Sequence, residues 1–225
     1  MAIKDFAMTT ARPLPVLILA DTSGSMAADG KIDALNQALR DMVQSFAAES
    51  RLRAEIHLGI ITFGETAQFY LPFTPAHRLT GIDACNAYGS TPLGAAMELA
   101  RGLLENRDLI PSRAFRPVLV LASDGHPTDD WETPFQTLLA SERAQKATRY
   151  ALAIGNDADE MMLREFHNDA ESTLFHADDA RSIIRFFRAV TMSVANRSRS
   201  QNPAQSAPID YRKAGNNPDE LDLDF

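Results

Sequence analysis

Residues 14–25 read LPVLILADTSGS, and this stretch decides the fold. Its first part, residues 14–20, is an apolar run rich in Val, Ile and Leu, which is typical of a strand buried on both faces of an α/β sheet. The rest supplies a carboxylate and two hydroxyls at alternating positions, from Asp21, Ser23 and Ser25. Open parallel sheets bind ligands at the carboxyl ends of their strands. The loop is therefore a candidate binding site, with an ordinary turn or helix N-cap as the alternative.

Strands and helices alternate along the rest of the chain. We expect strands at residues 14–20, 54–63, 66–73, 116–123, 150–155 and 172–176, and helices at residues 31–50, 92–104, 133–148, 159–167 and 178–194. This alternation predicts a doubly wound, mainly parallel α/β sheet with helices on both faces. A connection of about two residues after residue 63 permits only an antiparallel hairpin at that point.

The predicted domain covers residues 14–195. With 225 residues and 45% apolar content, the chain is long enough for one domain of ordinary size. Residues 1–13 form an N-terminal extension, and residues 196–225 change to a polar, Pro-containing composition that predicts a disordered tail with an acidic end. Apolar and acidic residues alternate at positions 221–225, which leaves two alternatives: a docking peptide or a solvated tail.

Charge and cysteine content exclude several classes of partner and compartment. The formal net charge is −8, with 30 acidic and 22 basic residues, which argues against a nucleic acid or an anionic membrane as the main partner. The N-terminus lacks the apolar segment of a signal peptide, and no stretch approaches the length of a membrane span. Cys85 is the only cysteine, which fits a reducing compartment. We expect a cytoplasmic protein.

Two more oxygen donors follow elements of the predicted sheet. Thr91 precedes a helix that begins near Pro92, and Asp124 follows the strand at 116–123. With Asp21, Ser23 and Ser25 they offer two carboxylates and three hydroxyls, a donor set that hard cations prefer. Such a set suits Mg²⁺ better than Zn²⁺. Helix capping by Thr91, and a simple turn at Asp124, are the alternatives.

Three motifs carry a resemblance to a known family. Residues 16–26 (VLILADTSGSM), 89–94 (GSTPLG) and 118–127 (VLVLASDGHP), in this order, resemble the von Willebrand factor A (VWA) domain and its metal-ion-dependent adhesion site, or MIDAS. The resemblance extends over residues 14–194. Among VWA proteins, the chain is most similar to small bacterial intracellular members associated with tellurium resistance.

The resemblance implies a site and a function. It implies a sheet of about six strands with one antiparallel edge strand. The expected metal ligands are Asp21, Ser23, Ser25, Thr91 and Asp124, around Mg²⁺, with Mn²⁺ or Ca²⁺ as alternatives. Ala20 and Ser123, which precede the two acids where the family often has larger residues, remove no ligand.

The expected function is a non-enzymatic interaction module in a bacterial stress-response or signalling complex. A cation with an open position can bind an Asp or Glu side chain from a protein partner. The acidic tail, through Asp222 or Asp224, is an alternative occupant of the same site.

An enzymatic alternative uses the same strand ends. A metal-dependent phosphoester hydrolase is one form of it. Ser23 or Ser25 acting as a nucleophile with His126 as base is another, although no Gly-x-Ser-x-Gly turn surrounds either serine. Tyr88 and Trp131, beside these loops, are either contact residues for a partner or packing residues.

Overall fold

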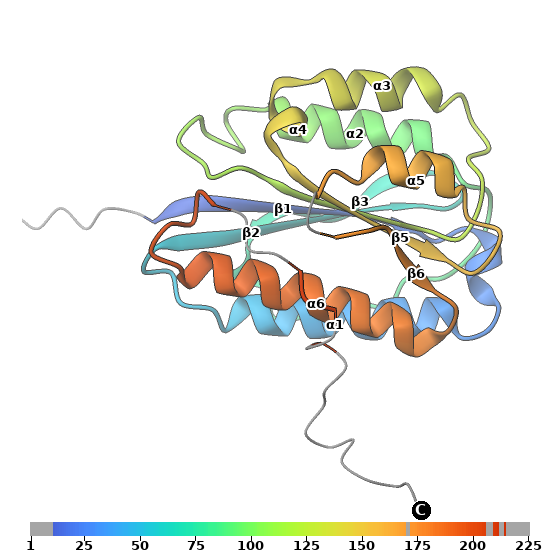
Figure 1. Cartoon of the computed structure of the whole chain (residues 1–225), viewed down its shortest axis with the longest axis horizontal. Coiled ribbons are helices and arrows are strands. Elements are labelled where there is room, and N and C mark those ends of the chain that lie inside the picture. Colours follow the sequence, from blue (N-terminus) through green and yellow to red (C-terminus); the bar gives the residue numbers. More distant parts are fainter. Residues whose placement is uncertain (1–10, 170–171, 206–208, 212–213, 215–225) are drawn as a thin grey trace, which may run out of the picture.

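Six strands form one sheet in the described part of the chain (Figure 1). The computed structural model describes residues 11–169, 172–205, 209–211 and 214. The strands are β1 (Arg12–Asp21), β2 (Ala54–Phe63), β3 (Ala67–Pro75), β4 (Val118–Ser123), β5 (Thr148–Ile154) and β6 (Phe175–Ala177). Their order is β3-β2-β1-β4-β5-β6, and β3 pairs antiparallel with β2 whereas the other neighbours pair in parallel. The predicted mainly parallel six-stranded sheet with one antiparallel edge strand is confirmed.

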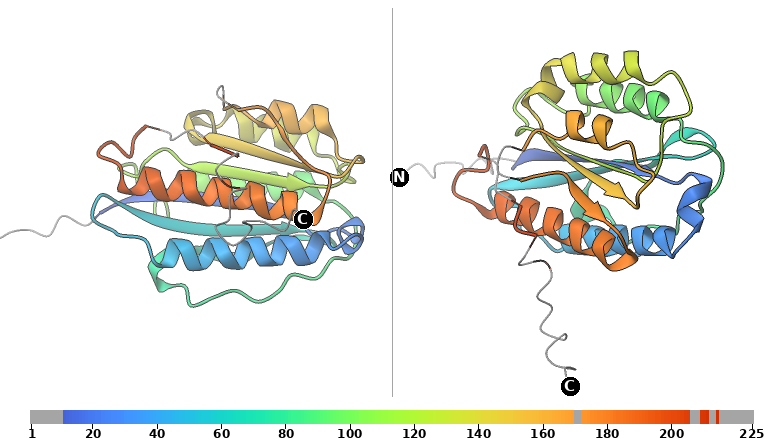
Figure 2. Two further views of the ribbon diagram at one scale, coloured as in Figure 1. Left: turned by 60° about the horizontal axis from the view of Figure 1, so that its bottom comes forward. Right: turned by 45° about the vertical axis from the view of Figure 1, so that its right-hand side comes forward.

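Helices cover both faces of this sheet. They are α1 (Lys31–Ala47), α2 (Leu93–Glu105), α3 (Glu132–Ala140), α4 (Glu142–Lys146), α5 (Glu160–Phe166) and α6 (Ala180–Arg199). Figure 2 shows α1 and α6 side by side on one face, while α2 to α5 cover the other. No helix in the described residues is long and apolar enough to cross a bilayer.

The alternation of side chains along β1 explains why its apolar run is continuous. Val16 and Ile18 pack into the core on the α1 and α6 face, whereas Leu17 and Leu19 pack into the core on the α2 face. Successive side chains of a strand point to opposite faces, so a strand covered on both faces needs apolar residues at every position. This requirement makes β1 the centre of both cores.

The parallel strands end at one side of the sheet, which we call the carboxyl edge. In the register of β1 and β4, Ala20 lies opposite Ala122, so the residues that follow these two positions lie side by side. The hairpin between β2 and β3 approaches the same edge closely. A Cβ atom on Gly64 would lie 2.7 Å from the carbonyl oxygen of Thr22 and 2.8 Å from that of Tyr88. Only a glycine fits there without displacing the loop that follows β1.

The predicted helix at 133–148 is wrong in its continuity. Ser141 has extended backbone (φ −68°, ψ 146°) and separates α3 from α4. The backbone N–H of Thr148 already bonds the carbonyl of Pro117, because β5 begins at that residue. The helical region ends at Lys146, two residues before the predicted end at 148, because Thr148 already belongs to the sheet.

Packed structure continues beyond residue 195, where the predicted domain ends. Helix α6 continues to Arg199, and Ile209 and Ala214 are buried in the core beside it. The buried Arg197 donates hydrogen bonds to the carbonyl oxygens of Pro203 and Arg116. Polar side chains that bond to backbone carbonyls produce no hydrophobic period. The sequence pattern therefore gives no sign of the packed residues after position 195. Residues 1–10 and 215–225, which hold most of the predicted extension and the acidic end of the tail, lie outside the described residues.

Candidate metal centre

Asp21 ends β1 as a fully buried carboxylate. Its Oδ1 accepts a hydrogen bond of 2.8 Å from the backbone N–H of Ser23, and its Oδ2 accepts one of 2.6 Å from the hydroxyl of Ser123. Burial raises the pKa of Asp21, the hydrogen bonds oppose that change, and the nearby carboxylate of Asp124 raises the pKa further. A cation beside Asp21 would relieve the cost of keeping this buried group ionised.

Asp124 follows β4 and is also buried. Its Oδ1 accepts a 2.6 Å hydrogen bond from the hydroxyl of Ser25, and its Oδ2 accepts a 2.8 Å hydrogen bond from Nζ of Lys31. The hydroxyls of Ser23 and Ser25 are 3.0 Å apart. Ser25 is exposed and Ser23 is buried, so the two hydroxyl groups lie between the surface of the protein and the buried carboxylates.

Thr91 reaches the same edge from the loop before α2. A Cβ atom on Gly125 would lie 3.9 Å from Oγ1 of Thr91, which puts this hydroxyl beside the Asp124 turn. The backbone N–H and carbonyl groups of Thr91 bond the hydroxyl and the N–H of Thr128. The loop is therefore fixed on both sides of its hydroxyl.

Helix α2 is capped by a residue that the sequence did not reveal. The carboxylate of Asp129 accepts hydrogen bonds of 3.0 Å from the backbone N–H groups of Gly94 and Ala95. The residue before α2 is Pro92, and no side chain caps the helix from that position. Capping does not explain Thr91, because a carboxylate from another loop performs it.

Backbone hydrogen bonds hold the loops against one another. The N–H of Gly24 bonds the carbonyl of Gly89 at 3.1 Å, and the N–H of Tyr88 bonds that of Thr22 at 2.9 Å. Gly89 has a left-handed backbone (φ +80°), and a Cβ atom there would lie 2.5 Å from Cα of Glu65. These contacts fix the geometry of the candidate donors before any ligand binds.

The donors suit a hard divalent cation. The structure brings the five predicted residues to one edge, as two carboxylates and three hydroxyls. The described residues contain no group of three or more His, Cys, Asp and Glu side chains that could hold a metal, so a site rich in nitrogen or sulfur is not present among them. Oxygen donors of this kind are typical of Mg²⁺ sites. Their assignment as ligands stays a prediction.

His126 is not positioned as a base for either serine. Its side chain is 73% exposed, and Nδ1 lies 3.4 Å from the carboxylate of Asp159. The hydroxyl group of Ser25 instead donates a hydrogen bond to Asp124. The proposed pairing of a serine nucleophile with His126 finds no support in this geometry.

The two aromatic residues near the loops have different surroundings. Trp131 packs against the α2 core and meets the ring of Phe135 edge-on, with ring centroids 5.5 Å apart. Tyr88 is 49% exposed. Trp131 is therefore a packing residue, whereas Tyr88 stays available for contact with a partner.

Comparisons with known proteins agree with this arrangement. Residues 16–126 match the family model of the von Willebrand factor type A domain. A VWA structure from Catenulispora acidiphila superposes with a TM-score of 0.61 at 18% identity, covering 82% of this chain and 42% of that one. The chain has the fold of a von Willebrand factor A domain. Domains of this kind typically mediate protein–protein interactions through a metal-dependent site.

Two further proteins are similar to this chain. Proximal thread matrix protein 1 from the mussel byssus, with zinc in its MIDAS, has a TM-score of 0.60 at 16% identity, covering 83% of this chain and 46% of that one. The uncharacterized protein YfbK of Escherichia coli is 25% identical over 212 residues, covering 89% of this chain. The chain spans only 35% of the length of YfbK. These relatives do not confirm the predicted link with tellurium resistance.

Three residues make contacts at this candidate site that the sequence did not predict. The sequence shows Lys31 only as the first residue of a predicted helix and Ser123 as a departure from the family pattern, and it gives no sign that Asp129 caps a helix. A lysine in the first turn of a helix runs against the helix dipole, and this was a usable signal. The other two roles depend on contacts between distant loops.

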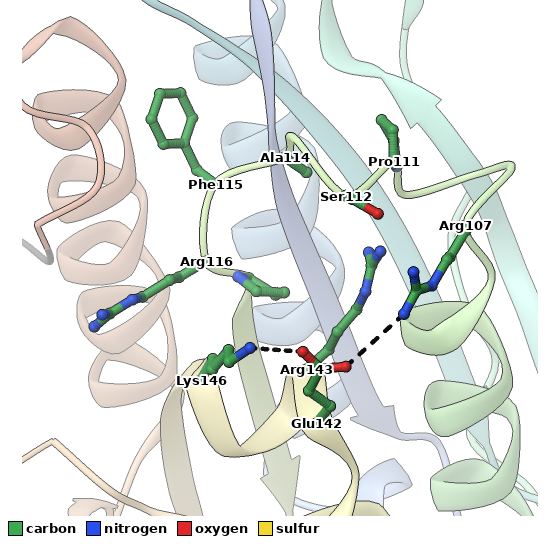
Figure 3. Close-up of a pocket in the computed structure, with 10 residues that line it drawn as sticks. Arg107, Pro111, Ser112, Ala114, Phe115, Arg116, Glu142, Arg143 and Lys146 are labelled. Carbon is green, nitrogen blue, oxygen red and sulfur yellow. Dashed lines mark hydrogen bonds and ion pairs between the residues drawn. The ribbon is translucent and has the colours of Figure 1, made fainter.

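A cavity of about 280 Å³ lies at the opposite edge of the sheet (Figure 3). Lys146 and Arg107 lie on either side of the Glu142 carboxylate, with nitrogen–oxygen distances of 2.7 Å and 3.9 Å. Arg116 and Arg143 add two more cations to the lining. None of the predicted metal ligands lies there, so this basic cavity is separate from the candidate metal centre.

Proposed function

We propose that the protein is a divalent-cation-dependent interaction module that binds an Asp or Glu side chain of a protein partner. Asp21, Ser23, Ser25, Thr91 and Asp124 would hold the ion, with Mg²⁺ as the expected species. One observation carries the proposal: two buried carboxylates and a set of hydroxyls, supplied by three separate loops, meet at the carboxyl edge.

Different residues have different roles in this proposal. Asp21 supplies a carboxylate, which hydrogen bonds from the Ser23 N–H and the Ser123 hydroxyl hold in one orientation. The exposed Ser25 and Tyr88 form the rim that a partner would meet first. A bound divalent cation would supply positive charge and a coordination position for the carboxylate of the partner.

An enzymatic role is the alternative, in the form of a metal-dependent phosphoester hydrolase. VWA domains are generally non-enzymatic interaction modules, and His126 is paired with Asp159 rather than with a serine. We therefore propose that the site binds and does not catalyse. Turnover of a generic phosphoester with Mg²⁺ or Mn²⁺, lost in Asp124→Asn, would support the alternative instead.

The cellular setting is part of the proposal. The resemblance to small bacterial VWA proteins suggests a stress-response or signalling complex, and a single buried cysteine fits the cytoplasm. The net charge of −8 argues against nucleic acid or an anionic membrane as partner. The acidic C-terminal end of the chain is a second candidate for the open coordination position.

Affinity capture with the purified protein tests the proposal. We expect a set of partners retained with Mg²⁺ to be lost with chelator and with Asp21→Ala, and to return when Mg²⁺ is restored. Asp129→Ala is the matched control, because it removes a carboxylate from the same edge that is not among the proposed ligands. Retention of the same proteins under every condition would overturn the proposal.

A further inference from the structure

Lys31 occupies one oxygen of a predicted metal ligand. Its Nζ lies 2.8 Å from Oδ2 of Asp124, whose side chain is fully buried, while the Lys31 side chain is 19% exposed. We propose that Lys31 is a built-in competitor of the divalent cation: its ammonium group must leave Asp124 before the ion binds, so this residue sets the metal affinity of the site. The inference rests on the proposed metal site and adds its regulation.

The position of Lys31 in its helix points to this role. It is the first residue of α1, and it follows two residues with left-handed backbone, Asp29 (φ 54°) and Gly30 (φ 69°). A cation at the amino end of a helix is unfavourable because the helix dipole is positive there. The left-handed conformation is also uncommon for a residue other than glycine. The local chain thus departs from two ordinary preferences in the segment that brings Lys31 to Asp124.

The surroundings of the ammonium group favour its contact with Asp124. A Cβ atom on Gly155 would lie 3.6 Å from Nζ of Lys31, which places the ammonium group beside the residue that follows β5. Asp124 Oδ1 is already bonded to Ser25, which leaves Oδ2 for Lys31. The cluster therefore contains two buried carboxylates, those of Asp21 and Asp124, and one ammonium group as their counter-charge.

Competition follows from the charges. A divalent cation among these donors and the Lys31 ammonium would both be attracted to Asp124 and would repel each other at short range. Because Lys31 retains some exposure, its side chain can move toward solvent. Metal binding and release of Lys31 are then linked, so that removing the ammonium charge tightens metal binding.

Titration calorimetry with Mn²⁺ as the probe separates charge from hydrogen bonding at this position. We expect Lys31→Met and Lys31→Gln to bind Mn²⁺ at least about tenfold more tightly than the wild type, because both lack the repelling charge. Lys31→Arg keeps the charge and should stay within about threefold of the wild type. Lys146→Met, which removes an exposed ammonium from the opposite edge, is the control and should bind as the wild type does.

Amine labelling followed by mass spectrometry gives an independent readout in the unaltered protein. With saturating Mn²⁺, the amine of Lys31 should react several-fold faster with an acylating reagent, while the labelling of Lys146 stays the same. Unchanged or slower labelling of Lys31 would overturn the inference.

The two proposals fail in different ways. If the wild type binds Mn²⁺ and Lys31→Met binds it equally or more weakly, Lys31 only supports Asp124, and the interaction site survives without this regulation. If neither the wild type nor any Lys31 variant binds Mn²⁺ or Mg²⁺, the metal site itself is wrong, and the Lys31–Asp124 contact is a structural ion pair.

Discussion

Two lysine–carboxylate pairs, one at each edge of the sheet, have nearly equal lengths and very different surroundings. At the carboxyl edge, Lys31 and Asp124 are 2.8 Å apart, with side chains 19% and 0% exposed. At the opposite edge, Lys146 and Glu142 are 2.7 Å apart and both are 61% exposed. Distance alone would rank the pairs as equivalent.

The two pairs differ in their exposure to solvent. Water and salt screen the exposed pair, and such pairs typically contribute little to stability. A buried carboxylate that loses its partner is left as an unpaired buried charge, which is costly. A cation that binds at the carboxyl edge would therefore interact strongly with the buried carboxylates. The charges of the basic cavity are solvated, so they would interact with a ligand more weakly.

The largest expected effect is the loss of metal binding at one edge alone. Asp124→Ala should weaken Mn²⁺ binding by more than about 100-fold, because it removes a ligand and not merely a supporting group. Glu142→Ala, at the basic cavity, should leave the affinity unchanged. Calorimetry on both variants measures the contrast, and equal losses in the two would remove the distinction between the edges.

A smaller effect is expected where Ser123 supports Asp21. Ser123→Ala removes the 2.6 Å hydrogen bond to Asp21 Oδ2 and leaves the ligands in place. We expect about tenfold weaker Mn²⁺ binding, as for other residues that orient a metal ligand. The same titration tests this, with Ser112→Ala, at the basic cavity, as the control; an affinity equal to that of the wild type would show that Asp21 needs no such support.

Asp129 separates capping from metal binding within the carboxyl edge. Asp129→Ala leaves the N–H groups of Gly94 and Ala95 without their acceptor and should lower the free energy of unfolding by about 1 kcal/mol. Denaturant unfolding measures the change. If stability is unaffected while Mn²⁺ binding is abolished, Asp129 is a missed ligand and not a cap.

The smallest effect belongs to the exposed pair. Glu142→Gln should leave the melting temperature unchanged within error, since the pairs that it breaks with Lys146 and Arg107 are both solvated. Thermal unfolding at low and high salt checks this. A clear loss of stability at low salt alone would mean that the basic cavity holds its charges more tightly than their exposure suggests.

Sequence reasoning predicted the fold and the candidate donors because both depend on local patterns. The apolar run at 14–20 specified a central strand, and the acids at the end of β1 and directly after β4 followed from where such strands end. The contact between Lys31 and Asp124 joins residues 93 positions apart, and no period in the sequence encodes it. The true end of α6 was missed for a related reason, because Arg197 is buried by hydrogen bonds to distant carbonyls.

Paramagnetic broadening by Mn²⁺ in an amide NMR spectrum tests most directly whether the cation binds at the carboxyl edge. Signals from residues close to a bound Mn²⁺ ion disappear first. We predict early loss of the Gly24, Ser25 and Gly125 amides at low Mn²⁺, while those of Arg143 and Lys146 remain sharp. Broadening centred on Arg143 and Lys146, or no selective broadening at all, would contradict a metal site built from the ends of β1 and β4.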